Sequence, residues 1–525
     1  MSFSERLEKV GNAVDGAISV VAPQYAARRQ AARYAIRIGA SYFQGAKASR
    51  LTNNWSVGQE SADSTIYSDL QMLRDRSRDL NRNDGVAAGI TDTICTNAIH
   101  TGIRPQSRID AEALNLSPDQ AAVFQKQAEK VWLKWSGKCD ARNKLTFSEI
   151  ESLALRQIIE SGEFLAIRRA IKDDRPYYLA LDIIEPDRLD DPPDMRSDVN
   201  TRFGITSDDR GRPKKYHIRK THPGDTFRAR DDAHKFVAVK AEDTAGRKNV
   251  FHVFPILRPG QTRGVPFFAP VIEKFKMLAD YLEAELVAAR VAACFSAFVK
   301  TENPYGAAVG NAATTENSQR LEALEPGMIE YLGQNQDVTF ASPNRPGDTF
   351  DAFVSRILRM IGTALGLPYE LVLKDFSQTN YSSARAALLQ AYRVFQVWQS
   401  MIINHICQPV YELLIEEAWL RGELTAPGFQ SNKWEYTRTA WIPPGWRWVD
   451  PEKEAKADKI SIQMGLKTRA DSCSEQGQDW EEKAEQAAKE KAKYEELGLP
   501  WEGMKDKGGE EKADNAESKA DENKD

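Results

Sequence analysis

Apolar residues recur at helical spacing over long parts of the chain. Between residues 65 and 103 they follow three- to four-residue steps, as Leu70, Leu73, Leu80, Val86, Ile90 and Ile94. This spacing predicts helices there, and a second helical block is predicted from 118 to 161. The strongest helical pattern covers 269–295, where Pro270 suits a first turn. At about 1.5 Å per residue it predicts a rod of about 40 Å, which is long for a globular domain.

Short β-rich runs follow the second helical block. They lie at 177–184, 204–206, 215–219 and 250–254, and glycine and proline residues punctuate them. After 295 the helical period is lost until 346, and two further strand candidates lie at 328–332 and 338–340. The pattern predicts an α+β fold that is mostly α.

Helical sequence returns at 348–366, and a polar segment, 367–381, follows it. Pro368 interrupts this segment near its start. Ser382 or Ser383 is expected to cap the next helix, because a serine hydroxyl accepts a hydrogen bond from a free backbone N–H at a helix start.

The next helix is predicted to run from 382 to about 421 and contains Pro409. Proline lacks the N–H of an internal helical hydrogen bond and should kink this helix. Five tryptophans cluster just beyond, which predicts a packed core rather than a ligand cage. They are Trp419, Trp434, Trp441, Trp446 and Trp448. Residues 451–498 predict two charged helices that separate near 468–477.

The charge balance excludes a uniformly basic protein that coats nucleic acid. The 525 residues include 71 Lys and Arg against 76 Asp and Glu, a formal net charge of -5. Such a surface still lets nucleic acid slide past, because tight phosphate binding would hinder sliding. Residues 1–50 are locally basic, which predicts either a solvated helical face or a contact with nucleic acid or an acidic subunit. Residues 501–525 are acidic, poor in apolar groups and predicted to be disordered.

The sequence contains no catalytic or metal-binding constellation, so no catalytic residue, metal site or cofactor is predicted. The five cysteines are widely spaced without a CxxC pair, which favours a reducing compartment. The segment 260–264, GQTRG, resembles a nucleophile elbow, but it has threonine in the serine position and prolines on both sides. His252 lies among apolar residues and is interpreted as a core or sheet histidine. The longest apolar stretch, 286–299, is too short to span a bilayer and contains Arg290.

The order of these elements, a long helix, a small excursion, a second helix, a polar loop and a long kinked helix, resembles that of tailed-bacteriophage portal proteins. Six segments also resemble the lambda-type portal family, both in their amino-acid sequences and in their order along the chain. They are RSRDLNRND at 76–84, SGEF at 161–164, RPGQTRGVP at 258–266, LPYE at 367–370, DFSQTNYSSAR at 375–385 and WRWVDP at 446–451.

The resemblance implies a portal fold whose parts can be assigned along the chain. An α+β wing would be followed by two long stem helices around a small α/β clip, then by a tunnel loop, a kinked long helix and a helical crown. The assigned ranges are 1–65 (N-terminal basic arm), 66–267 (wing), 268–295 (first stem helix), 296–346 (clip), 347–366 (second stem helix), 367–381 (tunnel loop), 382–450 (long kinked helix and Trp-rich wing segment), 451–500 (crown) and 501–525 (acidic tail). The arm and the tail match nothing in the family.

The resemblance also implies partners and a location. A homo-oligomeric ring of twelve subunits would occupy one capsid vertex of the virion, after assembly in the host cytoplasm. Double-stranded DNA would pass through it, driven by the terminase large subunit. Head-completion or adaptor proteins and the tail would bind there later, and the major capsid and scaffold proteins would surround it. No membrane, cofactor or enzymatic activity is implied.

Candidate site residues follow from these assignments. In the tunnel loop we expect short polar and charged groups to face the DNA channel, namely Lys374, Asp375, Ser377, Gln378 and Asn380. Tyr381 and Arg385 are expected to anchor the start of the following helix. In the clip, the residues expected to meet the motor or adaptor are Lys300, Glu302, Asn303 and Arg320.

Two other classes of function remain open on the sequence. One is a phage head-maturation enzyme, a protease or nuclease, which would need a nucleophile with a base or a carboxylate metal site. The other is a monomeric nucleic-acid-binding module, which would need a concentrated basic patch. Particle mass separates them from a ring, because twelve copies of 58.9 kDa give about 700 kDa.

Overall fold

The computed structural model describes residues 57–225, 235–294, 297–300, 329–332, 350–446 and 451–501, with single residues at 25, 29, 55 and 232. The chain divides into two compact units, Met1–Thr65 and Ile66–Asp525. Nearly all of the predicted basic arm, and the acidic tail beyond residue 501, lie outside the described residues. The architecture below is that of the second unit.

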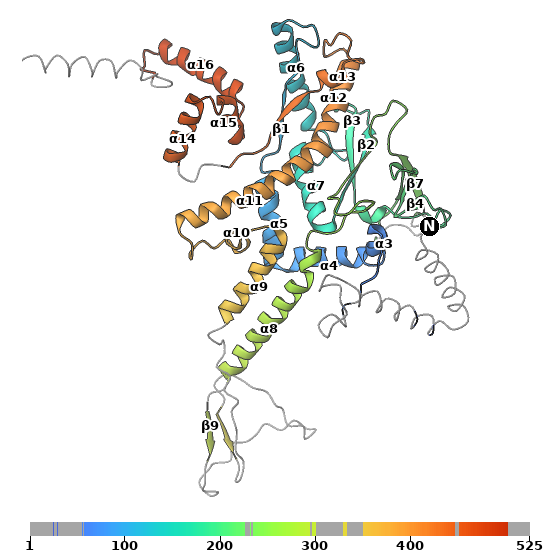
Figure 1. Cartoon of the computed structure of the whole chain (residues 1–525), viewed down its shortest axis with the longest axis vertical. Helices are drawn as coiled ribbons and strands as arrows, with labels where there is room; N and C mark the ends of the chain where they lie inside the picture. The colour runs from blue at the N-terminus through green and yellow to red at the C-terminus, as the bar shows by residue number, and fades with distance from the viewer. Residues whose placement is uncertain are drawn as a thin grey trace, which may run out of the picture. The chain divides into compact units, whose positions relative to one another are not determined.

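Helices dominate the described residues, which confirms the α+β, mostly α class (Figure 1). The helices are α3 (Ala62–Tyr67), α4 (Leu70–Asn83), α5 (Gly85–Ala98), α6 (Pro118–Ser136), α7 (Phe147–Ser161), α8 (Ile272–Cys294), α9 (Phe350–Leu365), α10 (Tyr369–Leu373), α11 (Tyr381–Ile402), α12 (Gln408–Leu420), α13 (Lys433–Tyr436), α14 (Pro451–Gln463), α15 (Arg469–Glu475) and α16 (Trp480–Glu496).

Within the described residues the strands form four small sheets. A three-stranded antiparallel sheet has the order β3 (Leu179–Ile184), β2 (Phe164–Ala170), β8 (Val250–Val253). A four-stranded antiparallel sheet has the order β4 (Thr201–Arg202), β5 (Ile205–Ser207), β6 (Pro213–Arg219), β7 (Phe236–Lys240). Two strand pairs are separate, antiparallel β1 (Arg104–Ser107) with β11 (Thr439–Ile442) and parallel β9 (Ala297–Lys300) with β10 (Ile329–Leu332). The strand candidate at 338–340 lies outside the described residues.

Local capping explains where the predicted helical blocks break. Asp84 ends α4 and begins α5, because its side chain accepts hydrogen bonds from the backbone N–H groups of Val86 and Ala87. Ser117 forms a capping box at the start of α6, and Thr146 forms one at the start of α7. Asp84 thus separates α4 from α5 within the first predicted block, and Thr146 begins the second helix of the other block.

One large hydrophobic core joins α5, α6, α7, α11 and α12. Its aromatic centre holds Trp132, Trp135, Phe147, Tyr411 and Trp441, in tilted and edge-to-face contacts. A smaller core lies between the two larger sheets, around Tyr216 and Ile218. The packed body therefore provides a rigid base for the elements that leave it.

The prediction that the tryptophan cluster forms a core is partly wrong. Trp441 packs in the core, and Trp419 and Trp446 are half-buried against other aromatic rings. Trp434 is 69% exposed, with the guanidinium of Arg438 over its ring. Residue 448 lies outside the described residues. Trp434 sits on the four-residue helix α13, which buries Tyr436 in the core and leaves Trp434 on its exposed side.

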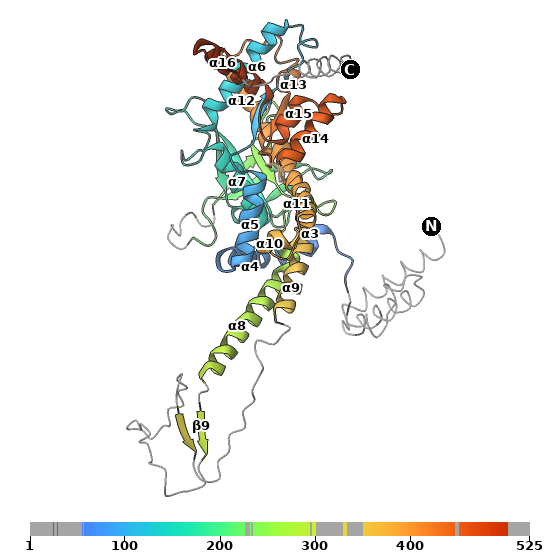
Figure 2. The same cartoon turned by 90° about the vertical axis from the view of Figure 1, so that its left-hand side faces the viewer.

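The two predicted stem helices lie side by side, as Figures 1 and 2 both show. Tyr281 of α8 contacts Phe350 and Phe353 of α9, with ring centroids 5.8 and 5.1 Å apart. The upper part of α8 also buries Phe275 and Leu278 in the large core.

The predicted distortion at Pro409 takes the form of a π-helical turn. Residues Ile403–Cys407 (η4) form this turn between α11 and α12, so Pro409 falls in the first turn of α12. In a first turn the backbone N–H is not needed for a hydrogen bond within the helix, so proline is tolerated there. This explains how a long helical run passes through a proline.

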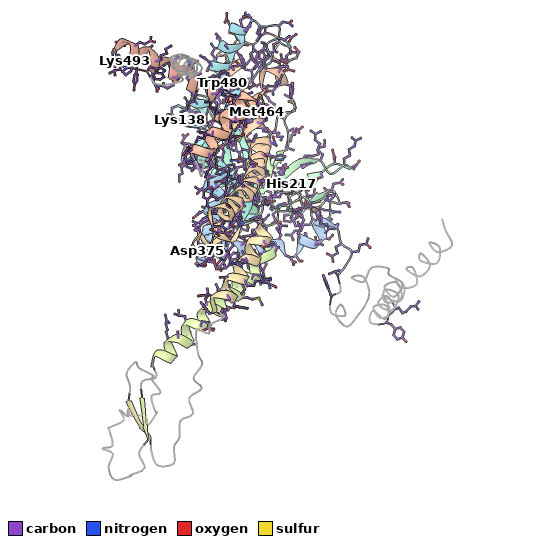
Figure 3. The ribbon with its side chains drawn as sticks, turned by 60° about the vertical axis from the view of Figure 1, so that its left-hand side comes forward. Lys138, His217, Asp375, Met464, Trp480 and Lys493 are labelled. Atoms are coloured by element: carbon purple, nitrogen blue, oxygen red, sulfur yellow. The ribbon has the colours of Figure 1, made fainter. Side chains whose placement is uncertain are left out.

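The predicted crown contains three helices rather than two. Thr468 and Asp471 form a capping box that starts α15 inside the stretch predicted to be a linker. In α14, α15 and α16 no residue is buried. Figure 3 labels Met464 at the end of the first crown helix and Trp480 and Lys493 on the last. The crown therefore has no core of its own.

Candidate functional site

The predicted tunnel loop, 367–381, contains a short helix that the sequence did not predict. Leu367 is buried, and Pro368 precedes the five-residue helix α10, whose Val372 is also buried. The helix ends at Lys374, which adopts the left-handed conformation with φ of 57°. The first half of the segment is thus a packed support, and the exposed part begins at Lys374.

Residues 374–380 form a tight, solvent-exposed connection that Figure 3 marks at Asp375. The Asp375 carboxylate accepts a hydrogen bond from the backbone N–H of Ser377 at 2.9 Å, and this bond lowers its pKa. Asn380 caps α11 by accepting from the backbone N–H of Ser383 at 2.8 Å. The expectation that Ser382 or Ser383 caps this helix is therefore wrong, because the amide side chain of Asn380 occupies that place.

The five predicted channel residues are thus brought together in one exposed turn at the start of α11. Lys374 and Asp375 are neighbours of opposite charge, and Ser377 and Gln378 are exposed and uncharged. Asn380 is exposed as well, but its side-chain oxygen is already engaged by the cap.

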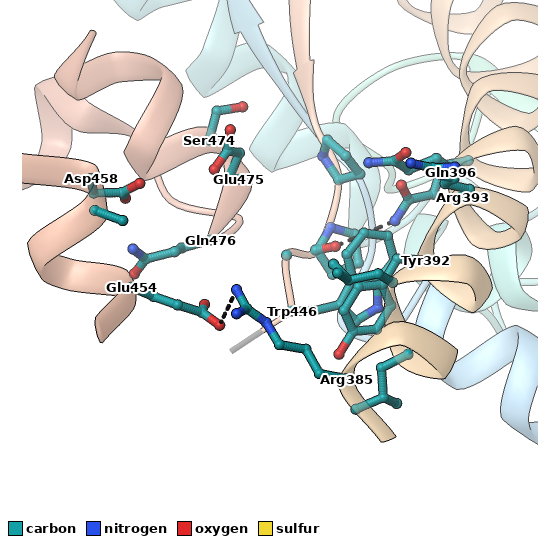
Figure 4. Close-up of a pocket in the computed structure, with 17 residues that line it drawn as sticks. Arg385, Tyr392, Arg393, Gln396, Trp446, Glu454, Asp458, Ser474, Glu475 and Gln476 are labelled. Carbon is teal, nitrogen blue, oxygen red and sulfur yellow. Dashed lines mark hydrogen bonds and ion pairs between the residues drawn. The ribbon is translucent and has the colours of Figure 1, made fainter. Parts of the chain in front are cut away.

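Tyr381 and Arg385 reach the crown. The ammonium group of Lys453 lies 5.8 Å from the centre of the Tyr381 ring. The Arg385 guanidinium pairs with Glu454 at 3.3 Å, a contact drawn in Figure 4. Both partners lie in the first turn of α14. The role expected of these two residues, anchoring the start of α11 after the loop, stays a prediction.

The predicted clip residues are almost wholly beyond the described part of the chain. Lys300 is the last residue of β9, where only the backbone is described. Glu302, Asn303 and Arg320 lie outside the described residues.

A buried charge cluster, absent from the sequence predictions, lies where β2 begins and the chain enters α8. Glu163 is fully buried and accepts hydrogen bonds from Arg74 at 2.6 Å, Arg263 at 2.7 Å and His252 at 2.9 Å. Burial raises the pKa of the Glu163 carboxyl, but Arg263 and Arg74 outweigh it and hold that pKa well below its usual range. His252 is therefore a satisfied sheet histidine, as predicted.

Arg263 ties this cluster to the surrounding loops. Its guanidinium also donates to the backbone carbonyls of Pro186, Leu189 and Phe203. The arginine of the GQTRG segment is thus a structural cross-link between the Glu163 cluster and the surrounding loops. The signal available in the sequence was the pair of family-like segments 161–164 and 258–266, which contain Glu163 and Arg263, whereas Arg74 lies just before the segment 76–84.

Two glycines allow the cluster to close. Gly162 has φ of 90°, and a Cβ built on it would lie 2.5 Å from the carbonyl carbon of Val265. A Cβ on Gly264 would lie 2.0 Å from the carbonyl oxygen of Gly162. The two backbones therefore touch, and only glycine fits at either position.

Within the described ranges, no group of three or more His, Cys, Asp or Glu side chains is placed to hold a metal ion. Among the same residues, no helix combines the length and apolarity needed to cross a bilayer.

The sequence was compared with known families and curated proteins. The model of the family described as phage portal protein, lambda family, matches residues 48–399. The probable portal protein of Halomonas phage phiHAP-1 is 25% identical over 468 residues, covering 87% of this chain and 88% of that protein. Portal protein B of Escherichia phage lambda is 24% identical over 479 residues, covering 85% of this chain and 88% of its own length.

Among solved structures, the chain is similar to one from the neck of a native gene transfer agent particle computed with C12 symmetry. The TM-score is 0.37 at 12% identity, covering 75% of this chain and 89% of that chain. A chain from the virion of the native particle has the same TM-score at 13% identity, covering 86% and 98%.

Proposed function

Because the chain belongs to the lambda family of phage portal proteins, we propose that twelve copies of it form a closed ring at one vertex of the phage capsid. Double-stranded DNA passes through the centre of this ring during packaging and leaves the same way. The ring forms in the host cytoplasm and remains in the virion. The protein serves as a channel and a docking platform, without catalytic activity of its own.

The proposal of a ring is supported by exposed apolar side chains on the stem helices α8 and α9. Met277, Leu282 and Leu286 on α8 are each roughly half exposed in a single copy, as are Phe353 and Met360 on α9. At about 3.6 residues per turn, Leu282 and Leu286 lie on one side of α8 and Met277 on nearly the opposite side. Two different apolar sides suit contacts with two neighbouring copies, and repeated contacts of this kind close a ring.

Particle mass tests the ring directly. The purified chain is expected to form particles of about 700 kDa with a central hole in electron-microscopy class averages. Replacing both Leu282 and Leu286 with Asp is expected to reduce the particles to chain-sized monomers. The matched control is Lys276→Asp on the charged side of the same helix, which is expected to leave rings intact. Compact monomers or two-fold dimers of the unaltered protein at micromolar concentration would refute the proposal.

The exposed turn 374–380 faces the channel and touches DNA weakly. This assignment is supported by the exposure of the polar groups in the turn and by the presence of a single cation, Lys374, among them. Twelve lysines around an otherwise acidic or neutral ring hold a phosphate backbone loosely, because each contact is screened by salt and exchanges quickly. Lys374→Glu is expected to leave the ring assembled but to shorten or destabilise the packaged genome. Normal packaging rate, genome length and retention in this variant would contradict the assignment, and Lys240→Glu on β7 serves as the control.

The remaining parts take the roles of the family. Residues 66–267 form the wing, 268–295 and 347–366 the stem, and 451–500 the crown. The clip, 296–346, binds the terminase large subunit and later the head-completion or adaptor proteins, and the body of the ring contacts the major capsid and scaffold proteins. Support for these partners comes from family membership.

The clip assignment is tested by a charge change that leaves the stem untouched. Arg320→Glu is expected to weaken binding of the terminase large subunit to purified rings, while the rings stay intact. Undiminished binding would remove this residue from the interface.

A further inference from the structure

The crown rests on α11 through a firm contact, here called the seat, formed by residues 443–446 and 474–477. A Cβ on Gly445 would lie 2.1 Å from the carbonyl oxygen of Glu475, so the two backbones touch. Next to this point the Trp446 ring stacks on Tyr392 of α11, with centroids 4.4 Å apart and planes 8° from parallel. The seat therefore combines backbone contact with aromatic stacking, and neither depends on salt.

A second and weaker contact, here called the latch, joins the first turn of α14 to the first turn of α11. It consists of the Arg385–Glu454 ion pair at 3.3 Å and the Lys453 ammonium over the Tyr381 ring. The side chains of Arg385 and Glu454 are 44% and 22% exposed, so water and salt reach the pair. Such pairs are individually weak and break easily.

An open cleft separates the two contacts, as Figure 4 shows. Leu389 and Gln396 of α11 line it from one side, and Ala457 and Asp458 of α14 line it from the other. Side chains do not fill this space, and α14 has no buried residue. Asp458 ties the middle of α14 to Ser472 of α15 and to Lys467, beside the seat. The start of α14 can therefore move away from α11 at the latch while its later part stays with the seat.

The last crown helix is held elsewhere. Glu485 of α16 pairs with Lys126 of α6 at 2.6 Å, and both side chains are more than half exposed. This contact keeps α16 near the body without restraining α14.

We propose that the latch couples the crown to the exposed turn 374–380. Tyr381 directly follows that turn and Arg385 lies one helical turn further on, so the first turn of α11 both continues from the exposed turn and holds α14. When the latch is closed, the start of α11 is braced from outside, and the turn and the first crown helix move together. When it opens, α14 pivots about the seat, and the first turn of α11 loses this brace. The coupling lies within one chain and does not depend on where the turn faces in an assembly.

Hydrogen–deuterium exchange of the purified full-length protein tests the coupling. Glu454→Arg places like charges at the latch and is expected to speed amide exchange roughly two- to fivefold, the weight of an exposed ion pair. The faster exchange is expected in two separate segments, 451–463 and 375–385. Adding Arg385→Glu restores an ion pair with reversed charges and is expected to return both segments to the original rates.

The matched control is Glu452→Arg. It makes the same charge change two residues earlier on α14, at a glutamate that pairs with Lys456 of the same helix. It is expected to leave the exchange of 375–385 unchanged. Faster exchange in 451–463 alone in Glu454→Arg would overturn the coupling. An equal effect of Glu452→Arg on 375–385, or no recovery in the double variant, would also overturn it.

Discussion

Removing the negative charge of Glu163 is expected to be among the most destabilising single changes in the molecule. In Glu163→Gln the guanidinium groups of Arg74 and Arg263 stay buried, 2% exposed each, without a carboxylate. Arg263 keeps three backbone carbonyls and Arg74 keeps the carbonyl of Ser161. Breaking a buried ion pair by removing one partner costs about 3–5 kcal/mol. Because these carbonyl acceptors remain, the expected loss of unfolding free energy lies near the lower end of that range, at about 3 kcal/mol.

Thermal unfolding measures this loss. For a compact unit as long as Ile66–Asp525, with an unfolding entropy of about 2.1 cal/mol/K per residue, about 3 kcal/mol corresponds to a melting temperature lower by roughly 3 °C. The matched control is Glu160→Gln, which removes a partly exposed carboxylate that pairs with Arg156 at 3.4 Å, and which is expected to cost about 0–1 kcal/mol. A shift in Glu163→Gln no larger than in the control would refute the reasoning from burial.

The pH dependence gives an independent check on the same residue. The folded pKa of Glu163 lies well below the ordinary value of 4.5. Its contribution is therefore present above that ordinary value and is lost as the pH falls through the folded pKa, because the unfolded chain takes up the proton first. The stability difference between the unaltered protein and Glu163→Gln is expected to shrink below about pH 4.5. A difference that stays constant from pH 7 to pH 3 would contradict the assignment.

Three further predictions follow from other features. Burial raises the pKa of Glu151 to about 8, so the folded protein holds a proton that the unfolded chain loses near 4.5, and stability that is present at low pH is lost as the pH rises toward 8. Denaturant unfolding at pH 5 and at pH 8 measures this loss. Between the two pH values, the free energy of unfolding should fall less for Glu151→Gln than for the unaltered protein. Lys374→Gly should raise stability by up to about 1 kcal/mol in thermal unfolding, since glycine adopts the left-handed conformation without strain, whereas Lys374→Val should lower it. Deleting 501–525 should leave melting temperature and ring formation unchanged, because the segment has few apolar groups to bury, and a large drop on truncation would show that it is packed.

Local signals predicted the helices well because their causes are local. The helix predicted at 269–295 agrees with α8 to within a few residues, because its limits follow from residue spacing. The Asp84 cap between α4 and α5 and the Thr468–Asp471 capping box of α15 are equally local, but neither break nor helix was predicted there. The seven residues of α15 carry no hydrophobic period, so the cap was the only available signal.

Long-range partners were not predictable in the same way. Strand β1 pairs with β11, and the register joins Arg104 to Ile442 across most of the chain. A buried charge also looks like a surface charge in a sequence, because nothing near Glu163 in the chain reveals that Arg74 and Arg263 will surround it. Asn380 shows a third limit, since several adjacent residues were able to cap α11 and only the backbone path decides between them.

The contact between Gly162 and Gly264 restricts how this chain can exchange parts with a relative. The two glycines lie a hundred positions apart in the chain, yet neither leaves space for a single added carbon. A chimera whose crossover falls between them takes one backbone from each parent, and the two must meet within a few tenths of an ångström. A crossover after residue 268 transfers α8 and the chain beyond it as a block and leaves this contact with one parent. Viable hybrids should therefore have their junctions outside 162–264, and this pair should mark the alignment register between relatives that share only a quarter of their residues.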